Sequence, residues 1–405
     1  MVLLRSLGPE VPRASTATAD HAVLLALGVE EASAGSHSEG WFVSLSQAQH
    51  VDVIFILCVV IYCGITALWA FYWIICRQQS FLAGKLYTPL ICISWGMTSV
   101  CMHVLNKATV ERTQAPAAIA TIQMAIAVGM MVPLAIFELF QVNLRQLSLW
   151  LVVPLFYGGA VCTSSFTYNY ISLSLYAILR NLTPLIVMPI ERLLMGEAKA
   201  PTITTTACLA LLVNVAGAVL YVGGIQGFSW KGIAFAVLNV VLAVIDRFIQ
   251  RRLLTEECKE LPTKVCTLVN NAVGILPSII VSLSSHEIQK ARLENAAAWN
   301  QPHNIILILL SGIAGLAICY LGFECQRIMS VTSFYVMQNV SRVFLIVVGV
   351  LLFKDPLQTA APILGMILSL GGSCVYGHIQ MHSQSKGPAQ TMGESEVNTA
   401  QKLAK

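Results

Sequence analysis

The chain has 405 residues, of which 56% are hydrophobic and only 11% are charged, with a net charge of +4. A soluble protein carries about 25% charged residues, so this composition indicates an integral membrane protein. The small net charge argues against a nucleic-acid-binding protein, which would show a dense basic stripe.

The twelve cysteines form no CxxC pattern, and most of them lie inside apolar runs. Cysteines in such runs behave as small hydrophobes. The sequence therefore predicts neither a disulfide framework nor a metal site, and it suggests no cofactor.

In chain order, residues 1–50 are rich in Ala, Ser and Gly and contain acidic residues, which predicts a disordered tail rather than a transit peptide. Apolar runs of about 20 residues then predict transmembrane helices, because backbone groups in lipid must bond internally. Eleven such runs follow, at 51–76, 87–107, 115–140, 149–171, 173–195, 201–223, 230–250, 264–285, 304–325, 330–353 and 360–380. The polar residues 382–405 predict a second disordered tail.

Basic residues in the predicted loops indicate the orientation, since cytosolic loops carry an excess of Lys and Arg. One side receives Arg77, Lys85, Arg145, Arg192, Lys199, Arg251, Arg252, Lys259, Lys264 and Arg327. The other side receives Lys107, Arg112, Lys231, Lys290, Arg292 and Lys354. The first side also holds the C-terminal tail, so we expect the C-terminus in the cytosol and the N-terminal tail opposite.

A weak internal repeat relates "LRNLTPLIVMPIERLLMGE", from Leu179, to "MQNVSRVFLIVVGVLLFKD", from Met337. Asn181 aligns with Asn339, Thr183 with Ser341, and Glu197 with Asp355. Chance similarity between apolar helices is one explanation. The other is a duplicated transporter with five spans per half, 87–223 and 230–381, and an extra helix at 51–76, which would place a substrate site between the halves.

Several polar residues lie where lipid would be expected. An ionisable residue at mid-membrane costs about 2.5–3.5 kcal/mol on insertion scales, so it usually faces a partner or a cavity. Arg342 is central in its span, and either a substrate anion or a structural partner would satisfy it; Arg180 is ambiguous in the same way. For Asp246, Arg247 and Lys107 we expect side chains that reach the membrane interface. The sequons at Asn181 and Asn339 lie inside spans, so we expect both asparagines to face the bundle interior.

The two arginines suit phosphate, because a guanidinium can form two parallel hydrogen bonds with it and keeps its charge. The adjacent Asn270 and Asn271 need partners within their span. Either packing against a neighbouring helix or contact with a substrate would supply them.

Four stretches, in order, resemble the drug/metabolite transporter superfamily, in its nucleotide-sugar and triose-phosphate translocator branch. The closest resemblance is to Golgi GDP-mannose transporters, whose FxxxNNxxS corresponds to "CTLVNNAVG" and whose GALNK corresponds to "QNVSR". Their KNLT corresponds to "RNLT", which places Arg180 on a lysine, and Trp95 falls on a tyrosine that precedes an "NK" pair. Ser341 replaces a lysine that the plastid triose-phosphate translocators have.

The resemblance implies an all-α polytopic membrane protein with the ten-helix fold of two inverted five-helix repeats. It implies an antiporter that exchanges a nucleotide sugar or sugar phosphate for a nucleotide monophosphate or phosphate in a Golgi or ER membrane; a homodimer is left open. The candidate substrate-binding residues are Trp95, Lys107, Arg180, Asn181, Asn270, Asn271, Tyr320, Phe334, Gln338, Asn339, Ser341 and Arg342. Trp95 and Phe334 would either stack on a ring or face lipid.

Two alternatives remain at this stage. One is a plastid-type sugar-phosphate/phosphate translocator in the plastid envelope. The other is a membrane receptor or scaffold without transport. An enzyme is the weakest hypothesis, because the sequence contains no HExxH, GxSxG or GxxxxGK[ST] motif.

Overall fold

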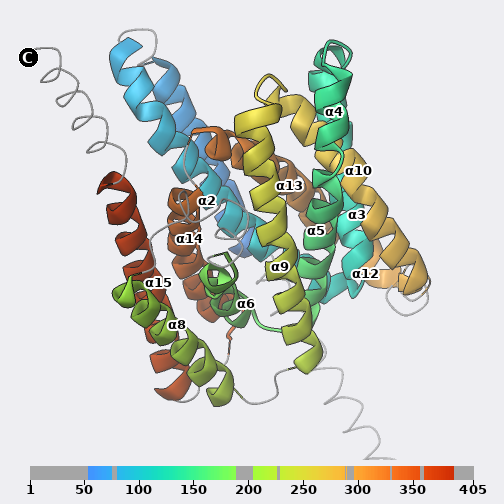
Figure 1. Cartoon of the computed structure of the whole chain (residues 1–405). Helices are drawn as coiled ribbons and strands as arrows, with labels where there is room; N and C mark the ends of the chain where they lie inside the picture. The colour runs from blue at the N-terminus through green and yellow to red at the C-terminus, as the bar shows by residue number, and fades with distance from the viewer. Residues whose placement is uncertain are drawn as a thin grey trace, which may run out of the picture. The chain divides into compact units, whose positions relative to one another are not determined.

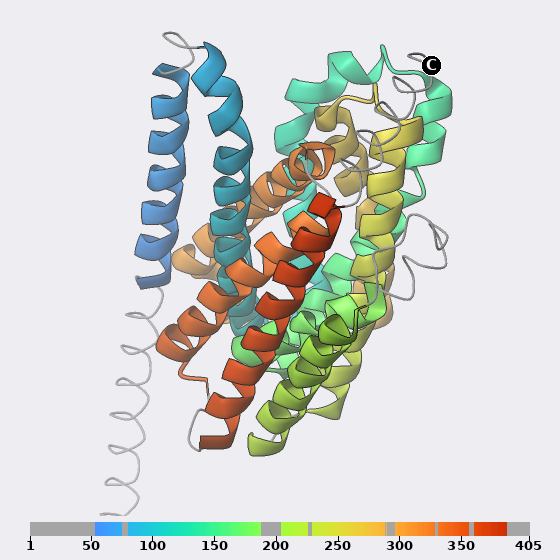
Figure 2. The ribbon, with the colours of Figure 1, turned by 60° about the vertical axis from the view of Figure 1, so that its left-hand side comes forward.

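The computed structural model describes residues 53–74, 80–187, 204–225, 229–287, 289, 296–328, 331–355 and 360–386. Within these ranges every regular element is a helix, as Figures 1 and 2 show. The predicted tail at 1–50 and most of the one at 382–405 lie outside the described residues, as do 75–76 and 188–195 of two predicted spans.

A first helix covers Val53–Ile74. The others are α2 (Ser80–Thr113), α3 (Pro116–Leu139), α4 (Leu144–Trp150), α5 (Val153–Tyr170), α6 (Leu173–Asn181), α8 (Thr205–Gly224), α9 (Trp230–Arg252), the π-helical turn η1 (Leu253–Glu257), α10 (Thr263–Ser284), α12 (Ala296–Asn300), α13 (Pro302–Ile328), α14 (Val331–Leu352) and α15 (Ala360–Lys386).

Among the described residues, nine helices are long and apolar enough to cross a membrane. Two shorter apolar helical stretches lie in the predicted spans 173–195 and 330–353. They are Leu173–Val187, which begins with α6, and Met337–Leu352, which is part of α14. Each of the eleven predicted spans thus contains a helix, and the all-α polytopic membrane class is confirmed.

Some helix ends differ from the predicted ones. The helix that contains Lys107 continues to Thr113, and α15 continues to Lys386, past the predicted start of the tail at 382. Other ends follow sequence signals: α3 begins at Pro116, where the missing N–H costs nothing. Ser172, Thr204 and Ser229 cap α6, α8 and α9 through their side-chain oxygens.

The helix packing has an internal symmetry. Helices α8 and α15 pack side by side, and so do α3 with α10 and α6 with α14 (Figure 1). The symmetry exchanges helices of the two halves in chain order: α2, α3, α5, α6 and α8 for α9, α10, α13, α14 and α15. Each of the three pairs above is unchanged by this exchange. The packed pair α2–α13 becomes α9–α5, which also pack together. This arrangement supports the predicted duplication, while its boundaries at 87–223 and 230–381 stay a prediction.

One crossing depends on a missing side chain. A Cβ on Gly158 of α5 would lie 2.2 Å from the carbonyl oxygen of Gly274 in α10. Only glycine allows the two backbones to approach so closely. The neighbouring Tyr157 donates to Asn271 Oδ1 at 3.5 Å across the same crossing.

Ties at both ends of the bundle join helices of the two predicted halves. At one end Lys264 pairs with Glu138 at 2.6 Å. At the other end Glu287 accepts the N–H groups of Ala117 and Ala118, both at 2.9 Å, at the start of α3. Burial raises the pKa of Glu287, although these two N–H donors act to lower it.

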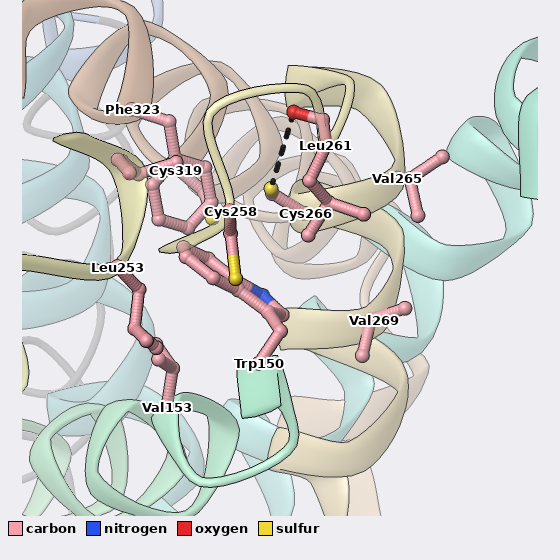
Figure 3. Close-up of a cluster of buried hydrophobic side chains, with 11 residues drawn as sticks. Trp150, Val153, Leu253, Cys258, Leu261, Val265, Cys266, Val269, Cys319 and Phe323 are labelled. Atoms are coloured by element: carbon pink, nitrogen blue, oxygen red, sulfur yellow. Dashed lines mark hydrogen bonds between the residues drawn. The ribbon is translucent and has the colours of Figure 1, made fainter. Parts of the chain in front are cut away.

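A hydrophobic cluster fills the space beneath the first end, where α4, α5, η1, α10 and α13 meet (Figure 3). The rings of Trp150 and Phe323 meet edge to face with centroids 5.4 Å apart. Cys319 packs among them as a small hydrophobic side chain, as the sequence predicts, and Cys258 and Cys266 pack in the same cluster. This cluster fixes α5 and α13, which both carry residues of the cavity described next.

Candidate functional site

A cavity of about 150 Å³ lies among eight helices: α2, α3, α5, α6, α9, α10, α13 and α14. Among the residues that the structure describes, those of α8 and α15 are absent from its lining. Three arginines line it, Arg180, Arg247 and Arg342, together with the carboxylate Asp246. Helices of both predicted halves therefore supply the charges.

Arg342 has a side chain fixed by amides. Its Nη1 donates to Asn339 Oδ1 at 2.6 Å and to Asn181 Oδ1 at 3.3 Å, and its Nη2 donates to Gln338 Oε1 at 3.0 Å. Asn339 and Gln338 reach it because residues three and four positions apart share a helix face. Asn181 comes from α6, so this contact joins two helices. Arg342 is only 6% exposed, and it keeps its charge in a site shielded from water.

Arg180, on α6, also lines the cavity. Its Nη2 donates to Asn239 Oδ1 at 2.8 Å, and its guanidinium lies 5.5 Å from the centre of the Tyr176 ring. His103 also lines the cavity, and its Nδ1 is 2.5 Å from the hydroxyl of Tyr168. We call the part of the lining that contains Arg180 and Arg342 the cationic end of the cavity.

Asp246 and Arg247, both on α9, form a second, mixed group of charges in the lining. Asp246 is 3% exposed, and its Oδ1 accepts from Gln250 Nε2 at 2.7 Å. The guanidinium of Arg247 lies 5.0 Å from the centre of the Phe334 ring, which itself packs on Trp95 at 4.9 Å. The prediction that Asp246 and Arg247 reach the membrane interface is wrong, because both line the cavity.

The predicted site residues separate into three groups. Six of them line the cavity: Trp95, Arg180, Asn271, Gln338, Ser341 and Arg342. Four others contact lining residues from behind. Asn181 and Asn339 accept hydrogen bonds from Arg342, Asn270 donates to Cys319, and the Phe334 ring packs on Trp95. Tyr320 and Lys107 are not brought into the cavity lining.

Tyr320 packs instead against Met131, Ala135 and Leu268. Lys107 is 5% exposed and donates to the carbonyls of Tyr168 and Ile171 at 2.7 and 2.8 Å, where α5 ends. A cation at a helix C-terminus stabilises the unpaired carbonyls. The prediction that Lys107 reaches the interface fails because α2 continues beyond it to Thr113.

Asn181 and Asn339 are 0% and 4% exposed, which confirms that both sequons face the bundle interior. Sequence reasoning missed several polar lining residues, and only some of them carry a signal. His103, like Asp246, is an ionisable residue within a predicted span, which itself marks a candidate site. The other missed polar residues are Ser99, Asn106, Gln123, Tyr157, Ser164, Tyr168, Tyr176 and Thr183.

Comparison with known proteins yields one family and several distant relatives. The model of the Triose-phosphate Transporter family matches residues 86–377. Nucleotide sugar transporter SLC35D2 of Homo sapiens is 23% identical over 248 residues, covering 60% of this chain and 70% of that protein. GDP-mannose transporter GONST3 of Arabidopsis thaliana is 23% identical over 292 residues, covering 71% and 77%. GDP-mannose transporter of Eremothecium gossypii is 22% identical over 318 residues, covering 74% and 94%.

Proposed function

The chain belongs to the Triose-phosphate Transporter family, and we propose that it carries a nucleotide sugar across a membrane in exchange for a nucleotide monophosphate. The family and the relatives compared are transporters, not enzymes. The names of the relatives, nucleotide sugar transporter and GDP-mannose transporter, support this class of substrate. A Golgi or ER membrane is the compartment that we propose.

The observation that carries the proposal is the cationic end of the cavity. Arg180 comes from the first predicted half and Arg342 from the second, and both line the same space. Guanidinium groups hold phosphate with paired, charge-assisted hydrogen bonds. A nucleoside-diphosphate sugar brings two phosphates, and a nucleotide monophosphate or a CMP-linked sugar brings one, so the same two arginines could serve both substrates.

Unsatisfied polar atoms around the cavity support a polar ligand. Among the described residues, Arg180 Nε, Trp95 Nε1 and Gln123 Oε1 are buried without a hydrogen-bond partner. Such atoms cost about 1–3 kcal/mol each unless a ligand or water satisfies them. Each of the three residues lines the cavity, so a bound substrate would supply the missing partners.

Each candidate residue has a proposed role in substrate binding. Arg342, fixed by its amides, binds phosphate. Arg180 takes part in one of the two access states, because the internal alignment does not make it the symmetry mate of Arg342. Asn270, Asn271 and Asn339 contact the base or the sugar, or position the groups that do.

Alternating access requires that ties between the halves open on one side at a time. The Glu138–Lys264 pair lies at one end, and the contact of Asp355 with the Ser174 N–H, at 2.7 Å, lies at the other. Both connect residues of different predicted halves. We propose that they break in alternate states.

The test is exchange in proteoliposomes. Vesicles that contain the purified protein are preloaded with GMP, UMP or CMP and offered radiolabelled nucleotide sugars outside. We expect uptake of a nucleotide sugar that a matching internal monophosphate accelerates. If no internal nucleotide stimulates uptake of any nucleotide sugar, the proposal is wrong. Microscopy of the tagged protein against Golgi and ER markers tests the compartment.

A sugar-phosphate/phosphate exchanger is the second candidate, and the small cavity of about 150 Å³ with three arginines favours it. A compact, doubly charged sugar phosphate needs less room than a nucleotide sugar. Inorganic phosphate should then compete strongly for transport, whereas a nucleotide-sugar exchanger should be insensitive to it. A receptor or scaffold without transport predicts no exchange of either kind.

A further inference from the structure

Phosphate binding at the cationic end leaves Asp246 without a role. This carboxylate lines the cavity and is 3% exposed, so it is largely removed from water. Its Oδ1 accepts one hydrogen bond, from Gln250, and no described residue donates to Oδ2. An ionised carboxylate has about four acceptor sites, and burying them unused is costly. The unused acceptors border the cavity.

Two glutamines hold Asp246 in place. Gln250 Nε2 donates to Asp246, while Gln250 Oε1 accepts from Gln326 Nε2 at 2.8 Å and from Arg247 Nη1 at 3.3 Å. These contacts fix which end of the Gln250 amide faces Asp246. They hold the acceptor Asp246 next to the donor Arg247 in the lining of the cavity.

The residues around Asp246 and Arg247 suit a flat ring. Trp95 lines the cavity and packs on Phe334, whose other neighbour is the Arg247 guanidinium. Tyr157 and Asn271 also line the cavity. Aromatic side chains stack on every nucleobase, so they give affinity without choosing a base. The choice must come from the polar edge.

We propose that Asp246 and Arg247 select guanine, with Asp246 as the specificity-determining residue; this inference rests on the nucleotide-sugar transport proposed above. Guanine places two donors side by side, the N1–H and the 2-amino group, next to the acceptor O6. The carboxylate of Asp246 receives the two donors, and Arg247 donates to O6. Adenine, cytosine and uracil each offer only one donor group on this edge.

The experiment compares GMP with IMP, which lacks the 2-amino group but is otherwise the same. Binding of each to the purified protein in detergent is measured by titration, without any need for transport. For the wild type we expect GMP to bind about tenfold more tightly than IMP, because a hydrogen bond to a charged group is lost. In Asp246→Asn the GMP affinity should fall by about tenfold and the GMP/IMP ratio should approach one.

Two further variants sharpen the test. Gln326→Leu removes the donor to Gln250 and should lower the GMP/IMP ratio partway, since Asp246 is then less well positioned. Glu256→Gln is the matched control: it also neutralises a carboxylate, but one that is 61% exposed and paired with Arg252 on the surface. It should leave both affinities unchanged.

Equal binding of GMP and IMP by the wild type would overturn the inference but leave the proposed transport intact. Equal loss of both ligands in Asp246→Asn would also overturn it, because a purely structural role has that effect. If Asp246→Asn weakens the binding of a GDP-linked sugar but not the binding of GMP, the carboxylate contacts sugar hydroxyls instead of the base, and the inference is wrong. If no nucleotide binds the wild type at all, the proposed function itself fails.

Discussion

Gly158→Ala should disturb the crossing of α5 and α10 in a way that the structure makes quantitative. The added Cβ would lie 2.2 Å from the Gly274 carbonyl oxygen, and real Cβ atoms essentially never come within 3.0 Å of another heavy atom. The helices must therefore separate by about 0.8 Å, the difference between these distances. Overpacking of this kind costs about 1–3 kcal/mol.

A gain partly offsets that cost, because Ala is favoured over Gly in a helix by about 1 kcal/mol. We expect a net loss of up to about 2 kcal/mol, with a lower melting temperature in detergent. The separation also pulls Tyr157 away from Asn271, and both residues line the cavity. Nucleotide binding should weaken together with stability.

The neighbouring Gly159→Ala is the matched control. Its Cβ would meet only Leu242 Cδ1 at 3.4 Å, an ordinary contact with a flexible side chain. It keeps the gain in helix propensity without the clash, so it should melt at or slightly above the wild-type temperature. If Gly158→Ala is as stable as Gly159→Ala, the reasoning about this crossing is refuted.

Two further predictions concern the opposite end of the bundle. Burial raises the pKa of Glu287 above its ordinary 4.5, although the carboxylate accepts two backbone N–H hydrogen bonds. The folded protein therefore binds this proton more tightly than the unfolded chain does. Its stability should fall as the pH rises through the raised pKa. Glu287→Gln cannot titrate and should flatten the melting temperature across that range; an unchanged pH profile would contradict the assignment. Gly349→Ala would place a Cβ 2.7 Å from both Asp355 Oδ2 and Ser174 Oγ, so we expect a loss of about 1–3 kcal/mol, and a melting temperature equal to that of the wild type would speak against it.

The fold was largely predictable because lipid imposes one simple rule on the chain. A segment that crosses a bilayer needs about 20 apolar residues, and that pattern is visible without any tertiary information. The predicted lengths were least accurate where a helix continues past the apolar run, as α2 does beyond Lys107. The continuation is stabilised by tertiary contacts, here the α5 carbonyls that Lys107 caps.

The site was predictable only in part, because a span's composition does not say which way each side chain points. Arg342 and Arg180 stood out as charges far from any water. Asp246 did not, because Arg251 and Arg252 follow it closely and suggested a helix end at the interface. In the fold, Gln250 and Gln326 surround that region, and Asp246 faces the cavity instead.

The most direct test of the central claim is trans-stimulated exchange by a charge variant of the cavity. Proteoliposomes preloaded with the best nucleotide monophosphate would carry wild type, Arg342→Ala, or Arg252→Ala, a control whose side chain is 66% exposed. We predict that Arg342→Ala abolishes stimulated uptake of the nucleotide sugar at equal reconstitution, while Arg252→Ala transports like the wild type. Normal stimulated uptake by Arg342→Ala would contradict the proposal that this cavity carries the substrate's phosphates.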